Sequence, residues 1–155
     1  MIFGNNCGWL HLEQLIDTPD NELIILIAAS KSVKPSPRVI ENEMSEEIQN
    51  LISNKVQMMQ DDSQRYMISF KAYIAYQGRN ESYAIGGDNE ISEGQGLIVF
   101  EKSKLLDYIH EFVDVDLAMA MHKKIKLLHY GVYTLNNIVD IVTFYEPIIE
   151  KISHN

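Results

Sequence analysis

Apolar and polar residues change their spacing several times along the chain, and these changes predict short strands and helices. Residues 22–30 form a continuous run rich in isoleucine and leucine, which predicts a strand buried on both faces. Residues 65–77 alternate instead, which predicts a strand with one core face and, given its length, a bend or bulge. The expected core face carries Tyr66, Ile68, Phe70, Ala72, Ile74 and Tyr76. Residues 56–60 should pair with this strand as a hairpin whose turn is at 61–64.

Two segments have apolar residues at helical spacing. In the segment after Ser36, Ile40, Met44 and Ile48 predict an amphipathic helix of about four turns that ends near residue 54. Ser103 is a good N-cap for a second helix. The inner face of that helix should carry Leu105, Leu106, Ile109 and Val113. An acidic loop or short helix should then continue to Met121.

The remaining segments are shorter. Residues 9–16 are compatible with a helix or a strand, whereas 97–101, 125–135 and 138–144 indicate strands, the last two joined by a turn at Asn136–Asn137. Residues 78–96 are irregular, with turns at the glycines of 86–89 and 94–96. Pro147 should end the last strand and leave a frayed tail.

Strands that come in adjacent pairs favour an antiparallel arrangement over a doubly wound one. We therefore expect residues 1–155 to form a single α+β domain, with a mostly antiparallel twisted sheet and two or three helices packed on it. No apolar run has the length of a membrane span, and the N-terminus lacks the pattern of a secretory signal. Cys7 is the single cysteine, which excludes an internal disulfide and agrees with a cytoplasmic location.

The net charge of −9 is concentrated in one part of the sequence. Residues 81–116 hold nine acidic and two basic residues, which is −7 of the total. Such a field repels nucleic acid and attracts a basic partner. A solvated surface that keeps the protein soluble is the alternative interpretation.

Candidate chemistry is sparse. Asp107, His110 and Asp114 have the spacing of one helix face, where they could bind a divalent metal or support acid–base catalysis, and a small metal-dependent hydrolase is the alternative function. A solvated or hydrogen-bonded His110 is the simpler interpretation. His129, between apolar neighbours, is typical of a half-buried structural histidine. The glycine turns do not match a phosphate-binding loop, Ser82 and Ser103 lack the context of a nucleophile, and we expect no cofactor and no metal.

Two segments, 99–109 (VFEKSKLLDYI) and 129–142 (HYGVYTLNNIVDIV), resemble a strand-to-helix step and a closing hairpin of small bacterial immunity proteins. These proteins are encoded beside polymorphic toxins, including those of contact-dependent growth inhibition. The resemblance covers the C-terminal third to half of the chain and carries no functional residues. It implies a cytosolic inhibitor, without enzymatic activity, that binds a basic toxin domain, often a nuclease.

Such an inhibitor would use carboxylates to imitate a nucleic-acid backbone and an aromatic side chain as an anchor. Tyr83, at the start of the acidic segment, is the expected anchor. The carboxylates expected to contact the partner are those placed in loops, where side chains can reach outwards: Glu81, Asp88, Glu90, Glu93, Asp114 and Asp116.

Overall fold

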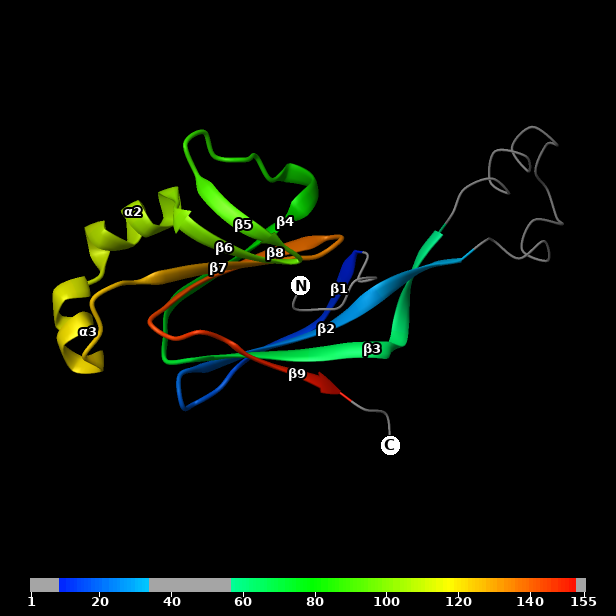
Figure 1. Ribbon diagram of the computed structural model, residues 1–155, viewed down its shortest axis with the longest axis horizontal. Helices are drawn as coiled ribbons and strands as arrows, with labels where there is room; N and C mark the ends of the chain where they lie inside the picture. Colours follow the sequence, from blue (N-terminus) through cyan, green and yellow to red (C-terminus); the bar gives the residue numbers. More distant parts are fainter. Residues whose placement is uncertain (1–8, 34–56, 153–155) are drawn as a thin grey trace, which may run out of the picture.

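Two antiparallel sheets dominate the protein (Figure 1). The structure is a computed structural model that describes residues 9–33 and 57–152. The first sheet has the order β1-β2-β3-β9, with β1 at Leu10–Asp17, β2 at Glu22–Val33, β3 at Gln57–Lys71 and β9 at Ile148–Ile152. The second has the order β4-β8-β7-β6-β5, with β4 at Tyr73–Asn80, β5 at Ile91–Gln95, β6 at Leu97–Lys102, β7 at Leu128–Tyr133 and β8 at Asn137–Thr143. The α+β class and the antiparallel pairing are confirmed.

The apolar run at 22–30 is the centre of the first sheet. It forms β2, whose partner is the alternating segment: Leu23 lies opposite Phe70, and Ile25 opposite Ile68. All four side chains are fully buried, because their shared face points at the second sheet. The segment at 9–16, which the sequence left open, pairs with β2 as the strand β1.

The predicted hairpin with a turn at 61–64 is wrong. β3 runs through this segment, and its pairing with β2 only shifts, from Arg65 opposite Ala28 to Asp61 opposite Ala29. β2 extends far enough to provide partners on both sides of the shift, so the polar residues form a bulge. The chain turns later, at Ala72, whose φ is 48°. The expected strand at 65–77 is therefore two strands, which belong to different sheets.

The main core lies between the two sheets. Leu10, Leu23 and Ile68 of the first sheet pack with Tyr130 and Ile141 of the second. Tyr66 is partly buried against this core, as expected for its face of β3. Beyond the turn at Ala72 the residues do not share this core face, contrary to the prediction. Ile74 packs in a second cluster, and Tyr76 is exposed.

Two helices lie together at one end of the second sheet: α2 at Lys104–Phe112 and α3 at Val115–His122 (Figure 1). Ser103 caps α2 as predicted, since its Oγ accepts a hydrogen bond from the backbone N–H of Leu106. Ile109 is the buried residue of α2, and it packs in the second cluster with Val142 and Phe144. No helix among the described residues is long and apolar enough to cross a membrane.

The C-terminal segment differs from the expected frayed tail. Residues 148–152 form β9, which pairs with β3 at the edge of the first sheet, Ile149 lying opposite Ile68. Its partners are about 80 residues earlier in the chain, so the local sequence gives no signal for this pairing. The helix predicted over 37–53 lies outside the described residues.

Candidate functional site

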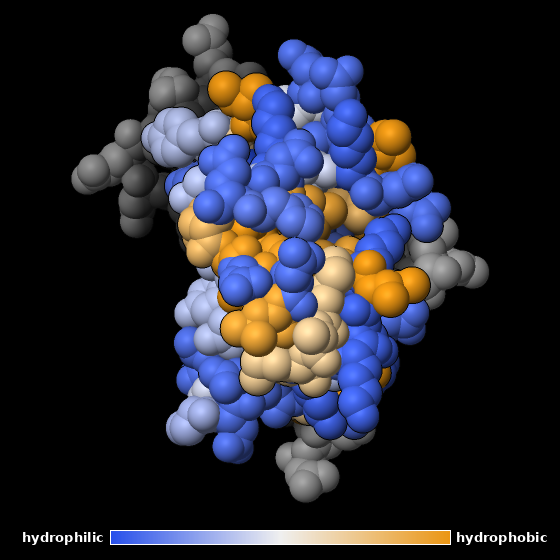
Figure 2. Space-filling view, turned by 90° about the vertical axis from the view of Figure 1, so that its left-hand side faces the viewer, coloured by the Kyte–Doolittle hydropathy of each residue, from blue (hydrophilic) through white to orange (hydrophobic). Residues whose placement is uncertain are grey.

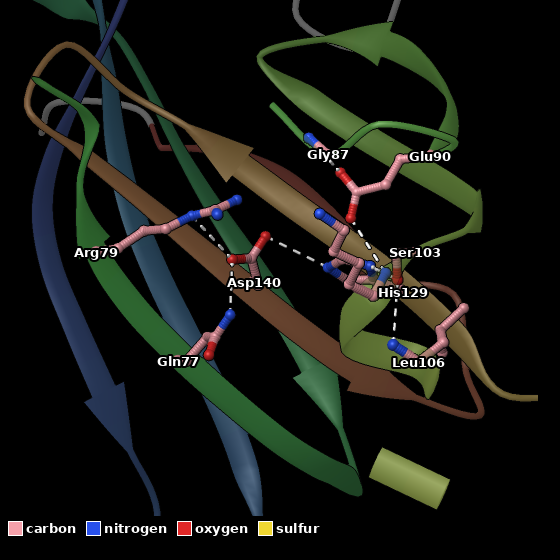
Figure 3. Close-up of polar contacts among 9 residues, drawn as sticks. Gln77, Arg79, Gly87, Glu90, Ser103, Leu106, His129 and Asp140 are labelled. Atoms are coloured by element: carbon pink, nitrogen blue, oxygen red, sulfur yellow. Dashed lines mark hydrogen bonds and ion pairs between the residues drawn. The ribbon is translucent and has the colours of Figure 1, made fainter. Parts of the chain in front are cut away.

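A chain of hydrogen-bonded polar side chains lies on the face of the second sheet next to α2, and its central members, Ser103, His129 and Asp140, are buried (Figure 3). Oγ of Ser103 is 2.8 Å from Nδ1 of His129, and Nε2 of the same ring is 3.3 Å from Oδ1 of Asp140. The second carboxylate oxygen of Asp140 accepts from Gln77 Nε2 and Arg79 Nε, each at 3.3 Å. Ser103 and Asp140 are each only 1% exposed, so these bonds supply the partners that burial demands.

The sheet register places these groups together. Asp140 of β8 lies between Gln77 of β4 and Gly131 of β7, and His129 lies two residues before Gly131 on the same face. A Cβ at Gly131 would lie 2.7 Å from the ring of Tyr133 and 3.1 Å from the ring of Phe100, so the glycine leaves room for both rings. Phe100 in turn stacks on the imidazole of His129, with ring centroids 4.2 Å apart.

The groups at the two ends of this hydrogen-bonded chain determine which atoms donate and which accept. A carboxylate only accepts, so Nε2 of His129 carries the proton that points at Asp140. In a neutral ring Nδ1 then accepts the hydroxyl proton of Ser103, whose oxygen still accepts from Leu106.

A serine, a histidine and an aspartate in this order resemble the triad of acyl-transfer enzymes. The surroundings do not suit a nucleophile. The Ser103 oxygen is held by the N-terminus of α2, and the side chain is almost completely buried. Ser103 is also not among the residues that line the neighbouring cavity. The geometry instead connects a helix to two strands.

A cavity of about 220 Å³ lies above His129 and Asp140. Its wall is formed by β4, β6, α2 and the loop that follows η2, the short 3-10 helix at Glu81–Tyr83. Polar and charged side chains at the wall are Gln77, Arg79, Glu90, Lys104 and Tyr108, and the apolar ones are Ile85, Phe100 and Leu105.

Glu90 fastens the loop to the helix. Its Oε2 accepts from the backbone N–H of Gly87 at 3.2 Å, and its Oε1 accepts from the backbone N–H of Lys104 at 3.1 Å (Figure 3). A carboxylate at the first turn of α2 is favoured by the free N–H groups and the helix dipole. Gly87 is required for this approach, because a Cβ there would lie 2.3 Å from Cδ of Glu90.

The residues predicted to contact a partner do not form one surface. Glu81 and Tyr83 lie in η2, Asp88 and Glu90 in the loop, and Glu93 in β5. We name residues 81–93 the acidic edge. Four of the five predicted residues in it are exposed, namely Glu81, Tyr83, Asp88 and Glu93, whereas Glu90 is half-buried. Glu93, which we expected in a loop, is on an edge strand and lines a second hollow of about 390 Å³ together with Glu101 and Lys126.

Asp114 and Asp116 belong to the start of α3, a helix at one end of the molecule (Figure 1). The Asp114 carboxylate is the N-cap of α3 and accepts from the backbone N–H of Leu117, whereas Asp116 is exposed in the first turn. Lys123, Lys124 and Lys126 follow α3 directly in the sequence.

Asp107, His110 and Asp114, the group of the alternative metal or acid–base interpretation, are all exposed. Among the described residues, no group of three or more histidine, cysteine or acidic side chains is arranged to hold a metal ion.

The helical end of the molecule also exposes apolar side chains. Figure 2 shows them gathered in the middle of this face, between hydrophilic margins. Phe112, Leu117, Met121 and Ile125 are the large exposed apolar residues here.

Sequence reasoning missed the polar chain. Ser103, His129 and Asp140 are separated by 26 and 11 residues, which is no recognised catalytic or ligand spacing. The available signal was a histidine between apolar neighbours in a strand, from which we expected partial burial. Comparison of the chain with protein-family models, curated proteins and solved structures found no match.

Proposed function

We propose that this protein acts by binding a basic protein partner along the acidic edge, without catalysing a reaction. More specifically, we propose that it is a cytoplasmic immunity protein that neutralises a cognate toxin domain, most readily a nuclease. The observation that carries the proposal is the unneutralised charge of the acidic edge. The resemblance of 99–109 and 129–142 to immunity proteins supports the specific form.

The acidic edge has four carboxylates and no basic residue. Ion pairs among the described residues join Lys31 to Asp61, Arg65 to Glu13, and Asp140 to Arg79 and His129. None of them involves the acidic edge. Its field therefore acts outwards, and it would accelerate the approach of a positively charged partner.

Two large side chains of the acidic edge are suited to anchor a partner. Tyr83 is 83% exposed and Ile85 is 87% exposed, so most of each side chain is free to contact a partner. They are flanked by Glu81 and Asp88, so apolar contact area lies inside a charged rim. Interfaces of high affinity have this arrangement, with anchors at the centre and charges at the margin.

The hollow beside β5 adds a place for a basic side chain. Glu93 and Glu101 line it together with Lys126 and the apolar side chains of Ile91 and Leu128, so carboxylates outnumber the one lysine at its wall. A lysine or arginine could bury its aliphatic stem there while its charged group meets the carboxylates. A nuclease cleft, which binds phosphates with such side chains, has the complementary chemistry.

The test uses the protein encoded by the reading frame next to the gene for this protein. The C-terminal domain of that neighbouring protein is expressed in a bacterial host with and without this protein, and growth is measured. We expect the domain to arrest growth and this protein to restore it. The triple variant Glu81→Gln/Asp88→Asn/Glu93→Gln should weaken binding of the purified domain at least tenfold at low salt, with a flatter salt dependence. Glu90 is left intact because it stabilises the loop.

The control variant, Asp20→Asn/Asp116→Asn/Glu150→Gln, removes the same charge from exposed positions outside the acidic edge. It should bind nearly as tightly as the wild type. Equal losses in both triple variants would assign the effect to net charge and contradict the proposed surface. A neighbouring domain that does not arrest growth, or an arrest that this protein does not relieve, would contradict the immunity function.

A further inference from the structure

The cavity above His129 contains acidic groups whose oxygens are already used. Each oxygen of Glu90 accepts a backbone N–H, and each oxygen of Asp140 accepts at least one side-chain donor. Asp140 is also too buried to meet a ligand directly. The carboxylates of the wall therefore attract a cationic ligand only weakly, although the protein as a whole is acidic.

Donors at the same wall remain available. Lys104 lines the cavity, and its ammonium has no ion-pair or hydrogen-bond partner within residues 9–33 and 57–152. Arg79 donates through Nε to Asp140. A guanidinium has five N–H donors in a planar fork, so Arg79 retains donors beyond this bond. The unused hydrogen-bonding capacity is thus cationic.

The other half of the wall is apolar, with Ile85, Phe100, Leu105 and the ring of Tyr108. A volume of about 220 Å³ is below the range of drug-sized ligand sites, which begins at roughly 300 Å³. A net charge of −9 also opposes polyanions such as nucleotides. A single planar anionic group on a compact apolar body satisfies all of these conditions.

We propose that this cavity binds a carboxylate attached to a small aromatic or branched aliphatic group. The carboxylate lies between Lys104 and Arg79, and the apolar body contacts Phe100, Leu105 and Tyr108. A free organic acid and the C-terminal carboxylate of a peptide share this chemistry. Ile85, Gly87 and Glu90 of the acidic edge also line this cavity, whereas Arg79 and Lys104, which bind the carboxylate, lie outside that edge. The binding experiment needs no toxin partner, so its outcome is independent of the proposed function.

Benzoate is a suitable probe, with benzamide as its uncharged isostere. We expect benzoate to shift the backbone amide resonances of Glu90, Lys104 and His129 in a saturable manner, and benzamide to bind at least tenfold more weakly. A peptide ending in phenylalanine, tested as free acid and as amide, decides between the two sources. Binding of the acid form in addition to benzoate assigns a chain terminus as a ligand, and binding of benzoate without it assigns a free acid.

Lys104→Gln should weaken benzoate binding about tenfold, the effect of losing one charge-assisted hydrogen bond. The matched control is Lys102→Gln, which removes an exposed lysine that does not line the cavity and should bind as the wild type does. Arg79→Lys keeps the charge beside Asp140 but loses the planar fork, and it should bind several-fold more weakly. Equal affinity for benzoate and benzamide, unchanged binding by Lys104→Gln, or no saturable shift would each overturn the proposal.

Discussion

The hydroxyl of Ser103 lies 2.8 Å from Nδ1 of His129, so one small side chain joins the N-terminus of α2 to the middle of β7. The same oxygen caps the helix, and the histidine continues the connection to Asp140 on β8. One buried hydroxyl therefore connects α2 to the hairpin of β7 and β8.

Ser103→Ala tests this connection. The substitution removes the helix cap and leaves Nδ1 of His129 buried without a partner, so we expect unfolding to require about 2 kcal/mol less free energy. Urea denaturation measures the change. Ser92→Ala, at an exposed position on β5, is the control and should change stability by less than about 0.5 kcal/mol. Equal stabilities for the two variants would show that the hydroxyl contributes nothing.

Phe70→Ala tests the core between the sheets. Phe70 is fully buried, faces Leu23 on the neighbouring strand and packs against Tyr130 with ring centroids 5.6 Å apart. The loss of its ring should cost roughly 3–5 kcal/mol of stability, since the surrounding sheets cannot close the cavity. Tyr83→Ala, also an aromatic truncation but at an exposed position, should cost less than about 0.5 kcal/mol. A small effect at Phe70 would contradict the packing of the two sheets.

Gly87→Ala tests the attachment of the loop to α2. The new methyl group would occupy the position of the Glu90 carboxylate, which must then swing away from the amides of Gly87 and Lys104. Hydrogen exchange at the Lys104 amide should become faster by tenfold or more, because its partner is lost. Gly86→Ala is the matched control, since a Cβ there meets no atom within 4 Å. If both variants exchange alike, Glu90 does not hold the loop.

Alkaline unfolding should depend on buried tyrosines. Burial raises the pKa of Tyr130, and a hydrogen bond to Asp17 together with burial raises the pKa of Tyr73. A raised pKa means that the fold favours the neutral phenol. This stability is fully present below the unfolded value of about 10, and it is lost as the pH rises through the folded value.

We therefore expect the urea midpoint of the wild type to decrease as the pH rises above about 10. Tyr130→Phe, which cannot ionise at this position, should lose less stability over the same interval. Parallel pH profiles for the two proteins would show that Tyr130 does not contribute to the alkaline transition.

Local patterns determined much of the fold. The apolar run at 22–30, the cap at Ser103 and the strands at 97–101 and 138–144 were all predictable, because caps and hydrophobic periodicity act over a few residues. The antiparallel α+β class followed from the order of these elements. The exposure of Glu81, Asp88 and Glu93 was also predictable from their charge.

Only the tertiary structure decided which segments meet. The polar residues at 61–64 have the composition of a turn, yet they became a bulge because β2 provides partners on both sides of them. Pairing of residues 148–152 with β3 depends on a strand far away in the chain. The contacts of Ser103, His129 and Asp140 were also decided in three dimensions. The register of β7 and β8 places His129 beside Asp140, and the N-cap of α2 places Ser103 against the ring, so that each buried polar group has a partner.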